Sequence, residues 1–333
     1  MTKGTKIFRI IISVLLGLTM LFSAFFAFAM GVHIVRDIMG ERYGILVAGV
    51  DVTRSNADDI LGDGTVSYDS YNNVLTFQNA EIEYDYTVVY SKNDLMINLI
   101  GENKLIMSGD YVPVIYASNY LIGKALTFFG EGSLSIEFEG TCGDATGIYA
   151  KDLRIETDIT ITMPDCTNIV NGIYSDGYLI LSGDANVTLN HGAGKYSTAV
   201  KVRNNIDIEH GAALNVSLRP GSTDICRGLD VGGSLFVWDD ASLNVSVDDE
   251  VAQLSECISV PGLFRVMENA KVTASSKKAY GIECYGSMEL NEGASISAST
   301  EGEGVDLFCH GSIVNYGATV DGEAEALGEI HSK

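Results

Sequence analysis

The chain has 333 residues, of which 44 are Asp or Glu and 21 are Lys or Arg, so its formal net charge is −23. Such a charge disfavours nucleic acid and anionic lipid surfaces as partners, while 46% hydrophobic and 20% charged residues exclude a disordered chain. The 36 glycines and only 4 prolines are typical of many short strands joined by tight turns.

The N-terminus predicts export. Three basic residues precede or open an uncharged run of 21 residues, Ile10–Met30. A helix of this length spans a bilayer with its basic flank in the cytoplasm, and Ala27-Phe28-Ala29 also resembles a signal-peptide cleavage site. We therefore expect residues 1–35 to form a cytoplasmic tail and membrane anchor or a signal peptide, and 36–44 to form a linker. The rest is expected outside the cell, anchored as a single-pass protein or secreted after cleavage.

Residues 45–82 predict an N-terminal cap. Thr53–Leu61 has capping residues followed by acids, a pattern that favours a short helix. Val66–Phe77 predicts a hairpin around Ser70-Tyr71-Asn72-Asn73. Together these elements would cover the open edge of whatever sheet follows.

A repeat occupies residues 83–322. Each unit contains three short strands, in each of which apolar and polar residues alternate, separated by glycine-rich or polar turns. Units of this kind predict an all-β, single-stranded parallel β-helix of about 8–10 coils, because one coil alone cannot bury its inner face. One inward ladder is expected at Ile148, Ile173, Val200, Leu229, Ile258, Ile282 and Leu307, and a second at Ala150, Ser175, Val202, Val231, Val260, Cys284 and Cys309. The polar segment 323–333 is expected to be a C-terminal tail.

The six cysteines show no C-x-x-C spacing, so a zinc site and a thioredoxin-like site are disfavoured. The second ladder places Cys284 and Cys309 in adjacent coils. In-register stacking points their Cβ vectors the same way, which favours two buried thiols over a disulfide.

The stretch Ile45–Ile82 and the repeats Gly147–Ile155 (GIYAKDLRI) and Gly172–Ile180 (GIYSDGYLI) resemble bacterial surface proteins with carbohydrate-binding β-helix domains. The resemblance covers roughly residues 45–320. It implies a right-handed helix similar to that of pectate lyases, with a polysaccharide or cell-wall glycan as the partner and calcium as an occasional cofactor. Coils from Thr198 onward lack the Gly-Ile-Tyr form, which argues against one binding surface shared by all coils.

The best candidates for ligand binding are four tyrosines. If their apolar neighbours point inward, Tyr90, Tyr116, Tyr149 and Tyr174 point outward from successive coils and form a flat platform. Sugar rings stack on aromatic faces, with phenol hydroxyls as hydrogen-bonding partners. Stacked aromatics also stabilise a sheet without any ligand, so both interpretations stay open.

Weaker candidates surround this row. Lys151 and Arg203, together with Lys201, carry the best argument for a polysaccharide lyase, and Trp238 is a candidate sugar contact or an edge-packing residue. Acidic turn residues are candidate calcium ligands, although aspartate is also an ordinary turn residue. They are Asp144, Asp152, Asp158, Asp165, Asp176 and Asp184.

Three functions are consistent with these features. The first is a membrane-anchored, carbohydrate-binding β-helix protein with no catalytic residues. The second is a structural stalk or protein-binding adhesin. The third is a polysaccharide lyase or hydrolase, which is disfavoured because the Asp-Asp pairs of the chain lack the residues expected around the acids of a glycosidase.

Overall fold

The computed structural model describes residues 21–23, 42–110, 112–118, 123–140, 142–248, 251–278, 280–302 and 304–332. Of the predicted anchor or signal segment only 21–23 are described, and they are helical; the remainder of that prediction lies outside the described residues. No helix within the described ranges has the length and hydropathy to cross a bilayer. The chain divides into two units, and the fold below is that of the larger one, Gly44–Val52 with Asn56–Lys333.

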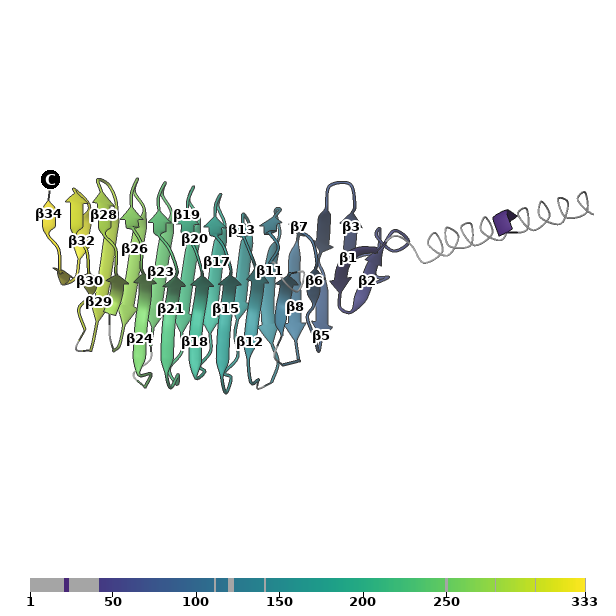
Figure 1. The fold of residues 1–333 in the computed structure, drawn as a ribbon, viewed down its shortest axis with the longest axis horizontal. Helices are drawn as coiled ribbons and strands as arrows, with labels where there is room; N and C mark the ends of the chain where they lie inside the picture. Colours follow the sequence, from purple (N-terminus) through teal and green to yellow (C-terminus); the bar gives the residue numbers. More distant parts are fainter. Residues whose placement is uncertain are drawn as a thin grey trace, which may run out of the picture. The chain divides into compact units, whose positions relative to one another are not determined.

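The larger unit is a parallel β-solenoid of about nine coils, as the repeat predicts. Its strands form three long sheets, here called A, B and C, and each coil contributes one strand to each sheet. Figure 1 shows the coils following one another in chain order, from β5 and β6 to the yellow C-terminal strand β34. Alternating apolar residues explain this arrangement, because each strand buries one face and leaves the other in solvent.

The strands of each sheet, in spatial order, are as follows. Sheet A contains β2 (Val50–Thr53), β1 (Arg42–Val47), β6 (Val89–Ser91), β9 (Pro113–Ala117), β12 (Ala145–Ala150), β15 (Ile169–Ser175), β18 (Tyr196–Val202), β21 (Ile225–Val231), β24 (Leu254–Val260), β27 (Tyr280–Cys284), β30 (Leu307–Cys309) and β33 (Ala324–Ala326). Sheet B contains β3 (Val66–Asp69), β4 (Val74–Gln78), β7 (Leu95–Ile100), β10 (Leu126–Phe129), β13 (Leu153–Ile155), β16 (Leu179–Leu181), β19 (Ile206–Ile208), β22 (Leu235–Val237), β25 (Phe264–Val266), β28 (Met288–Asn291), β31 (Ile313–Tyr316) and β34 (Ile330–Ser332). Sheet C contains β32 (Thr319–Asp321), β29 (Ser295–Thr300), β26 (Lys271–Ser276), β23 (Ser242–Val247), β20 (Ala213–Leu218), β17 (Asn186–His191), β14 (Asp158–Thr162), β11 (Ser133–Phe138), β8 (Glu102–Met107) and β5 (Glu81–Tyr84).

Both predicted inward ladders are confirmed. Ile148 pairs with Ile173 and Ile173 with Val200, and the same register continues to Leu307. These side chains are buried between the sheets. The core is therefore a stack of like residues, each lying on its counterpart in the coil before it.

The N-terminal cap is partly as predicted. The hairpin is confirmed, with β3 antiparallel to β4, and β1 also runs antiparallel to β6. The helix predicted over residues 53–61 is wrong, because Thr53 ends β2 and the residues after it form turns and bends. Their backbone groups bond to the hairpin instead of to a helical turn: the amide of Ile60 donates to the carbonyl of Val66, and the amide of Tyr68 donates to the carbonyl of Ala57.

Three boundaries differ from the predicted ones. β1 begins at Arg42, within the predicted linker 36–44, and β4 lies in a solenoid sheet although it falls in the segment 45–82. At the other end, β33 and β34 pair with β30 and β31, so residues predicted as a tail continue the solenoid. Their side chains are exposed or only partly buried, but backbone pairing with the preceding coil satisfies amides and carbonyls of these strands.

The cysteines behave in two ways. Cys284 and Cys309 lie in register as buried free thiols, which confirms the prediction for this pair. Each thiol donates to a backbone carbonyl of the preceding turn. Cys142 and Cys166 form a disulfide between adjacent coils, with their Cα atoms 4.8 Å apart. The sequence does not predict this second pairing, because both residues lie in turns outside the strand pattern.

Truncating the inward ladder should destabilise the solenoid. Ile173 is fully buried, whereas Ile169 of the same strand is 37% exposed. We expect Ile173→Ala to lower the free energy of unfolding by about 2–5 kcal/mol, because it leaves a cavity between two coils. Ile169→Ala is the matched control and should cost much less. Chemical denaturation followed by circular dichroism measures both, and equal losses would contradict the ladder as the main source of stability.

Candidate ligand-binding site

The outward residues of sheet A form one continuous row, here called the outer row. Strand pairing aligns each member with the next, since every residue of this row alternates with an inward one. In spatial order the row contains Leu46, Tyr90, Tyr116, Tyr149, Tyr174, Lys201, Asp230, Ser259, Glu283 and Phe308. The structure thus brings together all four predicted tyrosines, and the row changes from aromatic to charged between Tyr174 and Lys201.

The four tyrosine rings contact one another but do not form a flat platform. Successive ring centroids lie 5.7, 5.0 and 5.2 Å apart, and the ring planes are inclined by 36°, 63° and 52°. The predicted flatness is therefore wrong. Neighbouring coils lie about 4.8 Å apart, which is too close for broad aromatic rings to lie flat side by side on the sheet. The rings therefore tilt against one another, and such tilted contacts are electrostatically favourable.

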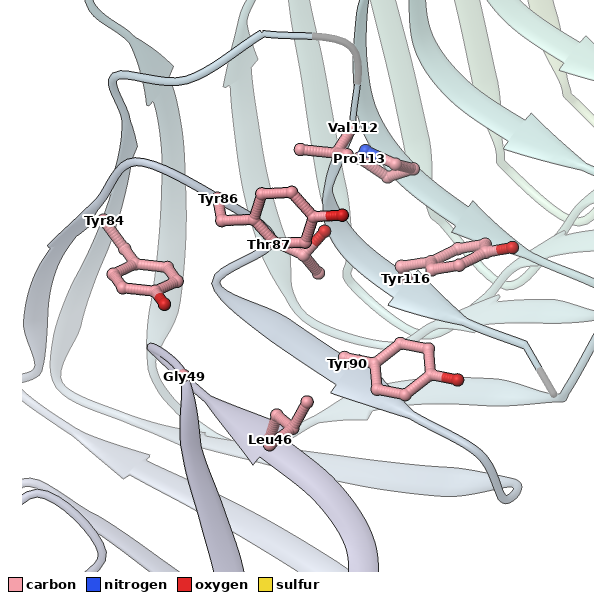
Figure 2. A pocket seen from close by; sticks show the side chains of 9 residues that line it. All are labelled: Leu46, Gly49, Tyr84, Tyr86, Thr87, Tyr90, Val112, Pro113 and Tyr116. Atoms are coloured by element: carbon pink, nitrogen blue, oxygen red, sulfur yellow. The ribbon is translucent and has the colours of Figure 1, made fainter. Parts of the chain in front are cut away.

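A pocket of about 470 Å³ lies at the N-terminal end of the outer row. Figure 2 shows the rings of four tyrosines around this space, with Leu46 and the turn at Gly49 beside them. Its described lining consists of Leu46, Gly49, Tyr84, Tyr86, Thr87, Tyr90, Val112, Pro113 and Tyr116. None of these residues is charged. The volume is within the range of about 300–1,000 Å³ that small-ligand sites occupy.

The cap shapes this pocket. The turn between β1 and β2 contains Gly49 with a φ of +76°, a left-handed conformation that favours glycine. A Cβ atom at Gly49 would lie 2.3 Å from the hydroxyl of Tyr84, so the tyrosine ring packs directly over this turn. Tyr86 follows on the way to β6 and is 58% exposed. The sequence analysis misses Tyr84 and Tyr86, although two tyrosines flanking Asp85 at a strand end were a usable signal.

Around Tyr149 and Tyr174, at the other end of the four tyrosines, the polar side chains form hydrogen bonds and ion pairs with one another. The hydroxyl of Tyr149 donates to Asp176, and the guanidinium of Arg203 lies 2.9 Å from Asp176 and donates to the hydroxyl of Tyr174 at 3.0 Å. Burial and the neighbouring Asp176 carboxylate raise the pKa of Tyr149 above its ordinary value. Lys201 lies 3.8 Å from Asp230. Arg203 is therefore engaged within the protein, which weakens the argument for a lyase.

A second polar cluster, absent from the sequence predictions, lies next to the charged half of the row. Glu256 is 2% exposed and accepts a hydrogen bond from Arg227 at 2.7 Å. Glu283 lies beside it and contacts His310 at 3.0 Å, and the ring of Tyr285 stacks on His310. Burial raises the pKa of Glu256 to about 7, against the opposing effect of Arg227. No periodicity signal marks such a cluster, because its members come from four successive coils and two of them, Tyr285 and His310, lie in turns.

Trp238 and Lys151 do not join the tyrosines. Trp238 follows β22 of sheet B, where its ring lies 5.3 Å from that of His210, whose imidazole contacts Asp239. Lys151 follows β12 and lies 3.7 Å from Asp152. The structure gives these two residues local partners and no common site.

Most of the acidic turn residues accept hydrogen bonds from backbone amides of the next coil. Asp144 accepts from the amide of Ile169, Asp152 from that of Tyr178, and Asp158 from that of Asn186. Asp165 likewise accepts from Ala193, Asp176 is paired as described above, and Asp184 lies near Gly211. Among the described residues, no group of three His, Cys, Asp or Glu side chains is arranged to hold a metal ion.

The buried Glu256 predicts a pH-dependent stability. Because its pKa is raised in the folded chain, the folded state holds a proton that the unfolded state has lost between about pH 4.5 and 7. Stability from this group is present at low pH and falls as the pH rises through this window, by a total of about 3 kcal/mol. Glu256→Gln should remove this part of the decrease in the free energy of unfolding.

Denaturation of both chains at pH 5 and pH 8 measures the effect. Glu292 is exposed, so Glu292→Gln is the control for replacing a glutamate by a glutamine outside the core. Parallel pH profiles for the native chain and Glu256→Gln would contradict the raised pKa.

Comparisons with known proteins identify no family for this chain. No family model, curated protein or solved structure matches the chain. The resemblance to carbohydrate-binding β-helix domains therefore stays an expectation. What the structure identifies is a fold, a parallel β-solenoid of about nine coils with an aromatic pocket at one end of its sheet A.

Proposed function

We propose that the chain is an exported carbohydrate-binding protein that recognises a polysaccharide or cell-wall glycan through the aromatic pocket and the tyrosines of the outer row. The observation that carries the proposal is the pocket itself, with four tyrosine rings around one uncharged cavity of about 470 Å³. It opens on a row of further rings, so one ligand of several units can contact both.

The chemistry of the pocket suits sugars. Ring faces offer dispersion to the C–H surface of a pyranose, and phenol hydroxyls are both donors and acceptors of hydrogen bonds. A rigid solenoid also presents these groups without a large ordering cost on binding. The tyrosine hydroxyls and the hydroxyl of Thr87 supply the polar groups that fix orientation.

Export and membrane attachment complete the proposal. They rest on the basic N-terminus followed by the apolar run Ile10–Met30. We also retain a right-handed winding for the solenoid, which is the handedness that the resemblance implies. In this view the solenoid stands outside the cell, held by the N-terminal segment or released after its cleavage.

A structural stalk is the second candidate. The observation that favours it is the internal pairing of the row, in which Tyr149, Tyr174 and Arg203 bind to one another and to Asp176. Contacts of this kind stiffen successive coils without a ligand. A stalk or adhesin of this form would bind a protein, or nothing, through the same face.

Removing two rings of the pocket tests the glycan proposal. We expect the purified full chain to bind at least one polysaccharide on a glycan array, and Tyr90→Ala/Tyr116→Ala to lower that affinity by tenfold or more, about 1.4 kcal/mol. Tyr71→Ala is the matched control, since Tyr71 is 94% exposed in the hairpin of the cap.

Three results would contradict the proposal. An array without any bound glycan, together with capture of a defined protein partner, would favour the adhesin. An unchanged affinity of Tyr90→Ala/Tyr116→Ala, with the fold intact by circular dichroism, would remove the pocket as the site. Shortening of the polymer during incubation would identify a hydrolase or lyase, because a binding protein leaves its ligand intact.

A further inference from the structure

The pocket lies at the N-terminal end of the outer row and is bounded on one side. The β1–β2 turn, with Tyr84 packed on Gly49, lines that side. Leu46 also lines the pocket, and the edge strand β2 follows β1 in sheet A. A chain-like ligand lying along the row would enter the pocket and reach this turn.

On its other side the pocket joins the rest of the row. Tyr116 lines the pocket, and the ring of Tyr149 lies 5.0 Å from it in the next coil. Tyr174 follows at 5.2 Å. Strands of adjacent coils lie about 4.8 Å apart, a spacing of the same order as one sugar unit of an extended polysaccharide. Successive rings can therefore contact successive sugars.

The aromatic track ends after Tyr174. Lys201 and Arg203 lie 5.9 and 5.8 Å from the centre of its ring, and both are paired with carboxylates, Asp230 and Asp176. Beyond this point the next two residues of the row, Lys201 and Asp230, are charged and pair with each other. The track thus consists of the pocket and two further rings, which is short compared with the whole solenoid.

The pocket lining sets the chemistry of the unit that enters it. Leu46, Val112 and Pro113 are apolar, and the polar side-chain groups of the described lining are hydroxyls. A carboxylate or phosphate inside would lose water without gaining a counter-charge, which is unfavourable. A methyl or acetyl substituent would instead contact the apolar residues and the ring faces.

We infer that this pocket binds the end of a glycan chain, taking up an uncharged terminal sugar with an apolar substituent such as an acetyl group, while the sugars behind it lie on Tyr149 and Tyr174. The inference rests on the proposed glycan function and makes it more specific. It predicts recognition of chain ends, whereas an open row would bind anywhere along a polymer.

The test uses N-acetylchitooligosaccharides of two to six units, which are neutral and acetylated, and oligogalacturonides of equal length as anionic counterparts. Isothermal titration with the full chain should show affinity rising up to about three units and then levelling, since the track contains the pocket and two further rings. Chitin fragments of equal mass and different mean length should bind in proportion to their number of ends. Oligogalacturonides should bind at least tenfold more weakly.

Two substitutions separate the pocket from the track. Leu46→Trp fills the pocket and should weaken binding of every length tenfold or more, whereas Tyr174→Ala should weaken only the longer oligosaccharides and leave the two-unit ligand unchanged. Leu327→Trp is the matched control, because Leu327 is 70% exposed. Thermal unfolding and circular dichroism confirm that each variant is folded.

Several results would overturn the inference. These are binding in proportion to polymer length, unchanged affinity in Leu46→Trp, equal binding of oligogalacturonides, or no binding of acetylated oligosaccharides by a chain that binds another glycan. They leave the proposed function intact as long as Tyr90→Ala/Tyr116→Ala loses affinity for the glycan that does bind. If the native chain binds no glycan at all, the proposed function fails and the inference fails with it.

Discussion

In-register pairing of parallel strands between successive coils is the constraint on which the rest of this molecule depends. Each strand finds its backbone partners in the coils before and after it, so a coil has no independent stability and the stack is the folding unit. The same register places Ile148 on Ile173 and Ile173 on Val200. Similar residues are then buried on top of one another and form the core. A shift of the pairing register by one residue would expose the whole ladder.

The register that builds the core also builds the surface. Because side chains alternate, a ladder of inward isoleucines implies a ladder of outward residues beside it, and here the first members are tyrosines. Their contacts stabilise the sheet, while each ring stays only partly buried on the outer face. A surface of this kind serves structure and recognition together, which is why a ligand and a stiff stalk are both consistent with the outer row.

The pocket arises where the regular pattern stops. In the interior of the solenoid each coil covers the next, which leaves a shallow outer face. At the N-terminal end β1 runs antiparallel to β6, and its turn lines one side of the pocket. Tyr84 at the end of β5 and Tyr86 in the connection to β6 complete the aromatic lining. Irregular elements at the end of a repeat thus create the concavity that the repeat itself lacks.

The sequence by itself determined the solenoid, both inward ladders, the stacked thiols Cys284 and Cys309, and the alignment of the four tyrosines, because a period of two within a repeat reports which face a residue occupies. Only the tertiary structure decided the tilt of the rings, the pocket with Tyr84, the disulfide of Cys142 with Cys166 and the buried Glu256. These depend on distances between turns and caps of different coils. Such segments have no periodicity, so their relative positions follow from packing and not from local pattern.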